Sequence, residues 1–218
     1  SGKLIMASPP PPPLDAELPM PSESAATRAR WFRVWRKVDL ARIHGYPLWD
    51  GPVREILRLN FVELCDIFAA YCEDSPPSLM TETGWTAFLR GGQLTPSTHL
   101  VRFCHNAFAG AVDAELGGIR VHGFLRLLCE LAFIRSNPTY DRAVPYELPP
   151  MPHEANGHEG PMPGSVNSSV MLQPLVQLAN ALRGLMAELN QVLLPAINAS
   201  PAIRERGTLH RDRNVQMV

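Results

Sequence analysis

The sequence predicts an all-α protein, and three observations support that prediction. Apolar residues recur with helical spacing along most of residues 25–136. The stretch from Glu55 to Ser136 divides into two successive helix–loop–helix units. Near the C-terminal end, leucines recur at alternating intervals of four and three residues, which is a heptad pattern. We therefore expect a helical domain with an N-terminal amphipathic helix and a C-terminal heptad helix.

The composition indicates how this chain is organised. It has 218 residues, and most of its 22 prolines fall within residues 9–21 and 138–163. Proline-rich segments favour extended or disordered conformations. The net charge of −1 and the lack of a long apolar run argue against a nucleic-acid partner and against a membrane span. The expected parts are a disordered Pro-rich arm at 1–24, a helical domain at 25–136 with the paired units at 55–136, a Pro/Gly linker at 137–167, the heptad helix at 168–197 and a polar tail at 198–218.

The first expected helix begins after Ser24, a favourable N-cap residue, and ends at Gly45 and Pro47. Its basic residues allow two interpretations. Either they dock on an acidic surface or on phosphates, or they stay in water while the apolar stripe packs on the domain. We favour the second, because arginines occupy much of the surface elsewhere in this Lys-poor chain. The stripe comprises Trp31, Val34, Trp35, Val38 and Ile43, and the basic residues are Arg28, Arg30, Arg33, Arg36, Lys37 and Arg42.

Capping and helix-breaking residues give the boundaries of the helices in the paired units. Two short β-compatible pieces, Leu79–Met80 and Ile119–Val121, lie in the two loops, and we expect them to pair as a two-rung mini-sheet. The expected helices run from Glu55 to Cys72, from Thr81 or Thr83 to Gly92, from Thr95–Pro96 to Gly110, and from His122 to Asn137–Pro138.

This layout is that of a paired EF-hand domain, but neither loop has the ligands for calcium. An EF-hand loop needs oxygen ligands at its first, third and fifth positions and a bidentate Glu at its twelfth. If the second loop starts at Asp113, Glu115 is third, but Gly117 is fifth and Phe124 is twelfth. The first loop has two prolines, at 76–77, where oxygen donors belong. We predict a sensor scaffold without a calcium site; the alternative is a calcium or zinc sensor with unorthodox ligands such as Asp113, Glu115 and backbone carbonyls.

The sequence predicts no metal, cofactor or catalytic site. The cysteines match no metal-binding spacing and lie mostly among apolar residues, so we expect buried free thiols. No two histidines share the helical spacing that zinc sites use, and the chain has no nucleophile elbow, P-loop or dinucleotide-binding glycine motif. We therefore predict a non-enzymatic protein, with an unrecognised enzyme as a third alternative. The four cysteines are Cys65, Cys72, Cys104 and Cys129.

The heptad helix also allows two interpretations. Arg183 and Glu188 are the only charged residues between Met171 and Ile197, and such charge-poor flanks favour burial on more than one side. The helix either forms the seam of a homodimer or of a coiled coil with another protein, or it folds back over the paired units, and we favour self-association. Pro195 is expected to close the helix. The residues expected to form the seam are Leu175, Leu178, Leu182, Leu185, Leu189 and Val192.

The segment from Phe68 to Arg135 resembles the family of tubulin polymerization-promoting proteins. The matching residues are Phe68, Trp85, Phe88, Leu89, Arg90, Phe108, Ile119, Val121, Phe124, Leu128, Glu130, Leu131 and Ala132. The resemblance implies a core of degenerate EF-hand-like helices. It also implies cytoskeletal work in the cytoplasm, at microtubules or in a cilium or flagellum, with tubulin among the candidate partners. The Lys-rich flanks and Gly-rich C-terminal repeat of that family have no counterpart in this chain.

These observations together predict a protein-interaction adaptor. EF-hand pairs bind the amphipathic helix of a partner in an apolar groove. In one version, the groove holds the chain's own N-terminal helix or its heptad helix. The aromatic residues expected to line the groove are Phe61, Phe68, Trp85, Phe88, Phe103 and Phe124.

Overall fold

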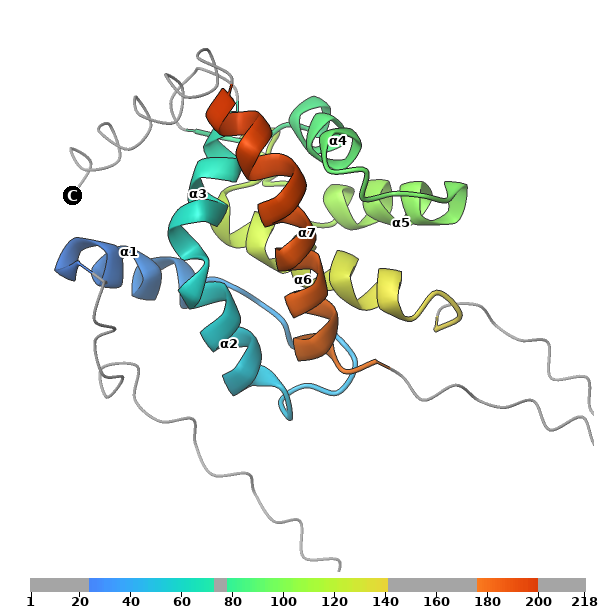
Figure 1. Ribbon diagram of the computed structural model, residues 1–218, viewed down its shortest axis with the longest axis horizontal. Coiled ribbons are helices and arrows are strands. Elements are labelled where there is room, and N and C mark those ends of the chain that lie inside the picture. The colour runs from blue at the N-terminus through green and yellow to red at the C-terminus, as the bar shows by residue number, and fades with distance from the viewer. Residues whose placement is uncertain (1–23, 73–77, 141–175, 200–218) are drawn as a thin grey trace, which may run out of the picture.

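The computed structural model describes residues 24–72, 78–140 and 176–199, and within these ranges the protein is all-α. A single cluster of buried apolar side chains draws members from every helix. Helix α7 lies across α3 and α6, with α1 on one side of the view and α4 and α5 on the other (Figure 1). None of the described helices combines the length and apolar character needed to cross a membrane. The helices are α1 (Ala25–Trp35), α2 (Asp50–Leu59), α3 (Phe61–Ala70), α4 (Glu82–Gly91), α5 (Thr98–Ala109), α6 (Val121–Ser136) and α7 (Leu178–Ala199).

Helix α1 begins where the sequence predicts. The hydroxyl of Ser24 accepts a hydrogen bond from the backbone N–H of Thr27 at 3.1 Å, so Ser24 is the N-cap. The helix ends at Trp35, and the expectation that it continues to Gly45 is wrong.

Local hydrogen bonding explains the early end of α1. The carboxylate of Asp39 accepts a hydrogen bond from the N–H of Ala41 at 3.1 Å, which stabilises a turn in competition with the helix. Leu40 and Ile43 are nevertheless buried. Turns therefore bury these apolar residues, although their spacing in the sequence predicts a longer helix.

The long helix expected from Glu55 to Cys72 is two helices that meet at Asn60. The side-chain amide and the backbone N–H of Asn60 both donate to the carbonyl of Ile56, at 2.8 and 3.3 Å. The carbonyl of Asn60 then accepts the bond from Leu64 that opens α3. Asn60 thus ends one helix and begins the next, while apolar residues continue on both sides.

Helix α4 approaches Tyr71 closely because two of its glycines face that residue. A Cβ at Gly84 would collide with the carbonyl oxygen of Tyr71. A Cβ at Gly91 would lie 2.7 Å from the Tyr71 hydroxyl. Glycine is required at Gly84, where the clash is with the backbone, whereas a side chain at Gly91 would make the end of the Tyr71 side chain shift.

The expected mini-sheet between the two loops is present as an antiparallel bridge. The N–H of Met80 donates to the carbonyl of Ile119 at 3.0 Å, and the N–H of Ile119 donates back at 2.9 Å. Helix α5 starts after Ser97 and not at Thr95–Pro96, because the Ser97 hydroxyl accepts a bond from the N–H of Leu100. The bridge ties α4 to the start of α6.

Helix α7 folds back over the chain and contacts α2, α3 and α6. Asn137, which ends α6 as predicted, is 4% exposed, and its side-chain amide pairs with the backbone of Val176. Its Oδ1 accepts from the Val176 N–H at 2.7 Å, and its Nδ2 donates to the Val176 carbonyl at 3.0 Å. Further along, Arg135 and Glu188 form an ion pair at 2.8 Å. These two contacts are called the latch below.

The residues expected to form a dimer seam are buried inside the chain. Leu178, Leu182, Leu185 and Leu189 are at most 2% exposed, and Leu175 lies outside the described residues. Within this chain the stripe packs on α2, α3 and α6, as in the fold-back alternative, and self-association through the same residues stays a prediction.

The buried stripe of α7 also departs from the heptad after Leu189. It continues through Leu193 and Ile197, whereas Val192 is 42% exposed. A straight α-helix has 3.6 residues per turn, so its buried face drifts away from a strict heptad repeat. The helix also runs through Pro195, which was expected to close it.

We predict that Asn137→Ala lowers the free energy of unfolding by about 1–3 kcal/mol, because it removes the hydrogen bonds that the buried Asn137 amide makes to the backbone of Val176 and to the carbonyl of Phe133. Urea denaturation followed by circular dichroism measures the change. Asn190→Ala, at an exposed site on α7, is the matched control and should change stability by less than about 0.5 kcal/mol. Equal effects of the two substitutions would contradict this account of the latch.

Candidate functional site

The aromatic residues predicted to line a partner-binding groove lie in the core. Each is at most 3% exposed except Phe103, which is half-buried. In this conformation they present almost no surface to a partner, and partner binding through these residues stays a prediction. The buried five are Phe61, Phe68, Trp85, Phe88 and Phe124.

Four of these residues form one aromatic cluster between α3, α4 and α6. Trp85 stacks on Phe88 with ring centroids 5.2 Å apart, and Phe124 meets Phe88 edge-on at 5.3 Å. Phe68 lies 5.5 Å from Phe124. Such pairs add about 0.5–1.5 kcal/mol each beyond their burial. The cluster therefore fixes α4 against α3 and α6.

Phe61 lies apart from this cluster and packs on the N-terminal helix. Its ring meets Trp31 edge-on at 5.2 Å, and Trp31 stacks on Trp35 at the same distance. Trp31 is fully buried. The aromatic face of α1 therefore packs on the domain, as the favoured interpretation of that helix expects.

Helix α7 occupies the face that α2, α3 and α6 would otherwise expose. Its leucine stripe is inserted into the common core. One hollow of about 220 Å³ lies between the end of α6 and α7, and another of about 190 Å³ lies between the start of α5 and the end of α6; both include Arg135 in their walls. Each is smaller than the typical pocket for a drug-sized ligand, which is about 300–1,000 Å³. The structure thus offers a helix-filled groove more than a small-molecule cavity.

The latch is the feature that the sequence pattern did not reveal. Asn137 reads as a helix stop, and nothing local indicates that it also bonds the backbone 39 residues later. Arg135 and Glu188 are ordinary surface charges within their own helices. Only the three-dimensional packing of α7 on α6 brings these groups together.

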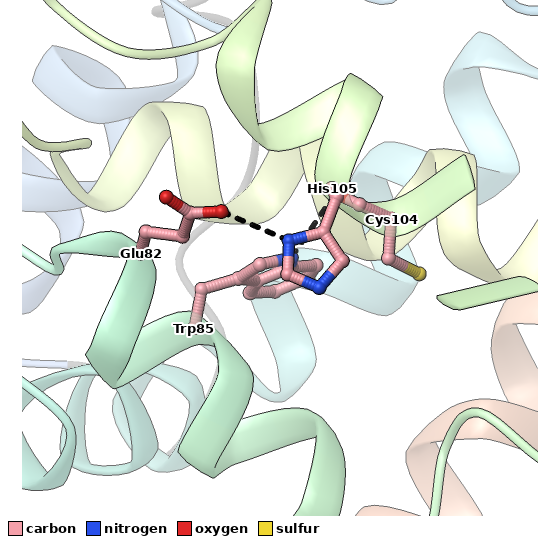
Figure 2. Close-up of polar contacts among 4 residues, drawn as sticks. All are labelled: Glu82, Trp85, Cys104 and His105. Carbon is pink, nitrogen blue, oxygen red and sulfur yellow. Dashed lines mark hydrogen bonds and ion pairs between the residues drawn. The ribbon is translucent and has the colours of Figure 1, made fainter. Parts of the chain in front are cut away.

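A histidine–carboxylate pair joins α4 to α5. His105 Nδ1 lies 2.9 Å from Glu82 Oε1, and the indole N–H of Trp85 donates to the carbonyl of Cys104 at 3.3 Å. Figure 2 shows the imidazole directed toward Glu82, while the sulfur of Cys104 points away from it. The pair lacks a nearby thiol nucleophile. It is an exposed contact between helices, worth less than about 1 kcal/mol.

The cysteine thiols are buried, as the sequence predicts. Burial raises the pKa of Cys104 to about 12, and Arg135 and Glu130 shift it less and in opposite directions. Burial also raises the pKa of Cys129. Because only the thiolate is a nucleophile, these two thiols are unreactive near neutral pH.

In the second loop, the carboxylate of Asp113 bonds the backbone of the loop itself. Asp113 Oδ1 accepts a hydrogen bond from the N–H of Glu115 at 3.1 Å, and the Asp113 N–H donates to the carbonyl of Gly118 at 3.1 Å. Among the described residues, no three His, Cys, Asp or Glu side chains gather as a metal site requires.

Basic groups gather where the end of α1 meets the start of α6. The pKa of His122 is lowered, first by burial and then by the nearby charges of Lys37 and Arg120, with Asp113 acting in the opposite direction. Arg30 lies over the ring of Phe61 at 5.8 Å from its centroid. Lys37 and Arg120, far apart in sequence, therefore both act on His122.

Comparison with known proteins finds no matching family model, no matching curated protein and no matching solved structure. A function for this chain is therefore argued from its own residues.

We predict that the four cysteines resist alkylation in the native protein and react fully once urea unfolds it. Their burial blocks access of the reagent. The raised pKa of Cys104 and Cys129 also lowers the fraction of thiolate, the reactive form, at neutral and mildly alkaline pH. Intact-mass spectrometry after iodoacetamide treatment counts the modified thiols. A cysteine that reacts in the native state at the rate of a free thiol would show that the helices around it open.

Proposed function

We propose that this chain is a non-enzymatic protein-interaction module, built on a degenerate EF-hand-like pair that does not bind calcium. Its groove is occupied by its own helix α7, which acts as an intramolecular ligand. A partner helix binds when it replaces α7. The seating of the α7 leucine stripe on α2, α3 and α6 is the observation that carries this proposal.

The arrangement of the loops supports the paired-unit part of the proposal. In an EF-hand pair, the two loops are joined by a short antiparallel bridge between their hydrophobic residues. Met80 and Ile119 make such a bridge through two reciprocal backbone bonds, and both side chains are buried. The helices that flank them carry the aromatic cluster of Phe68, Trp85 and Phe124.

The amphipathic character of α7 supports the proposal that a partner helix can take its place. An amphipathic helix that inserts a row of leucines into an apolar surface uses the same contacts as a bound target helix. The polar residues Arg183, Asn190 and Gln191 face solvent. If two copies exchanged their α7 helices, the same contacts would form a dimer, because each groove would still be filled.

The loop chemistry favours a partner-binding role over calcium sensing. Asp113 is engaged in the turn of the second loop, where its carboxylate caps the N–H of Glu115. A calcium ion would have to compete with this bond and would find Gly117 at a ligand position.

The setting that we propose is the cytoskeleton. It follows from the resemblance of Phe68–Arg135 to the tubulin polymerization-promoting proteins, and it covers a scaffold at microtubules or in a cilium or flagellum. Tubulin is a candidate partner.

We predict that loosening the latch lets an added copy of α7 enter the groove. A fluorescent peptide of residues 176–199 should bind the full-length double variant Asn137→Ala, Glu188→Gln at least about tenfold more tightly than wild type, because the groove is vacant more often. Fluorescence anisotropy measures both affinities.

The matched control is Asn190→Ala with Gln191→Ala on the exposed face of α7, which should bind the peptide like wild type. A peptide in which Leu182, Leu185 and Leu189 are replaced by serine should not bind. Light scattering on each variant separates peptide entry from helix exchange between copies. Equal peptide affinity for the latch variant and the control would contradict the proposal.

We predict that calcium produces no heat of binding at micromolar concentration, because neither loop offers the carboxylates of an EF-hand site. Isothermal titration calorimetry on the full chain measures this, with Asp113→Asn as the paired variant. A micromolar isotherm that disappears in Asp113→Asn would favour the sensor alternative.

A further inference from the structure

Positive charge is concentrated at one end of a nearly neutral molecule. Residues 25–45 contain six basic residues and one acidic residue, so their net charge is +5, whereas that of the whole chain is −1. Arg33, Arg36 and Lys37 are exposed. Figure 1 shows α1 at the edge of the helical domain, on the side away from α4 and α5.

A second element contributes to this charge. Arg120, the exposed residue before α6, lies in the region where Lys37 also acts on His122. Among the residues that the structure describes, no acidic side chain forms an ion pair with Arg36, Lys37 or Arg120. The exposed Asp39, two residues from Lys37, and Asp113, which opposes the effect of Lys37 and Arg120 on His122, offset only part of this charge. We call Arg33, Arg36, Lys37 and Arg120 the basic surface.

The aromatic packing holds this surface in place. Trp31 is fully buried between Trp35 and Phe61, so α1 cannot turn its basic residues toward the domain without losing that contact. A positioned set of arginines can bind carboxylates with two parallel hydrogen bonds each.

We propose that the basic surface docks an acidic segment of a partner protein. The acidic residues of the neighbouring helices limit how far an acidic ligand can extend. Residues 46–72 contain four acidic and two basic residues, and Glu55 and Glu63 are exposed on α2 and α3. A nucleic acid or an anionic membrane would extend beyond α1 onto α3, which packs on α1 through Phe61 and Trp31 and carries the exposed Glu63. A short Glu- or Asp-rich peptide can remain on the basic surface alone.

This inference deepens the proposed function, because it assigns a chemical class to a partner, but it does not depend on the groove that α7 fills. The two modes use different faces of the molecule. A partner that carries both an acidic segment and an amphipathic helix could engage both.

The test is fluorescence anisotropy with a labelled glutamate-rich peptide and the full chain at low salt. The triple variant Arg36→Gln, Lys37→Gln, Arg120→Gln should bind the peptide about tenfold more weakly than wild type, since each exposed ion pair contributes modestly. The matched control is Arg90→Gln, Arg102→Gln, Arg183→Gln, which removes the same charge from exposed sites on α4, α5 and α7. It should retain wild-type affinity, and added salt should weaken wild-type binding.

Three results would overturn the proposal: no peptide binding by wild type, equal loss in both triple variants, or tighter binding to an oligothymidine or to phosphatidylserine vesicles than to the peptide. Thermal unfolding of each variant confirms that the fold is retained. The latch variant Asn137→Ala, Glu188→Gln should bind the acidic peptide like wild type. Failure of groove exchange with intact peptide binding would reject only the proposed function, and the reverse pattern would reject only this inference.

Discussion

The burial of one face of α7 is the contact on which the rest of the fold depends. Its leucines reach three helices, α2, α3 and α6, that belong to different parts of the chain. Fully burying a leucine side chain contributes about 1.5–3 kcal/mol before entropy is counted. Without α7, the same three helices would expose their apolar sides to water. The helix thus completes a core that the other six leave open in the described part of the chain.

Polar contacts then determine the position of α7 along that surface. The buried Asn137 amide hydrogen-bonds both backbone groups of Val176, and a shift of α7 in register would leave these donors and acceptors unpaired. The Arg135–Glu188 pair is half exposed and adds little energy. The leucines supply most of the attraction, and the buried amide opposes a shift in register. That division is compatible with a helix that is bound in one position and can still be exchanged.

The sequence predicted the helical class, the Ser24 cap, the Met80–Ile119 bridge and the end of α6, because each depends on local chemistry or on apolar periodicity. It did not predict the break at Asn60, where the apolar pattern continues without interruption. Apolar periodicity does not distinguish a heptad repeat from the 3.6-residue repeat of a straight helix. It therefore predicts a buried Val192, whereas the structure buries Leu193. The aromatic residues were correctly expected to face inward, but whether a groove is open or filled depends on α7, which lies far away in sequence.

The two glycines of α4 carry a consequence for how this protein tolerates change. Gly51 and Gly184 face open space, so a larger residue there meets nothing. Gly84 instead makes room for the Tyr71 backbone, and even a methyl group there would push α4 off its neighbour, whereas one at Gly91 would displace only the end of the Tyr71 side chain. Mutational drift should therefore be free at Gly51 and Gly184, conditional on a shift of Tyr71 at Gly91, and closed at Gly84, although all four residues look alike in the sequence.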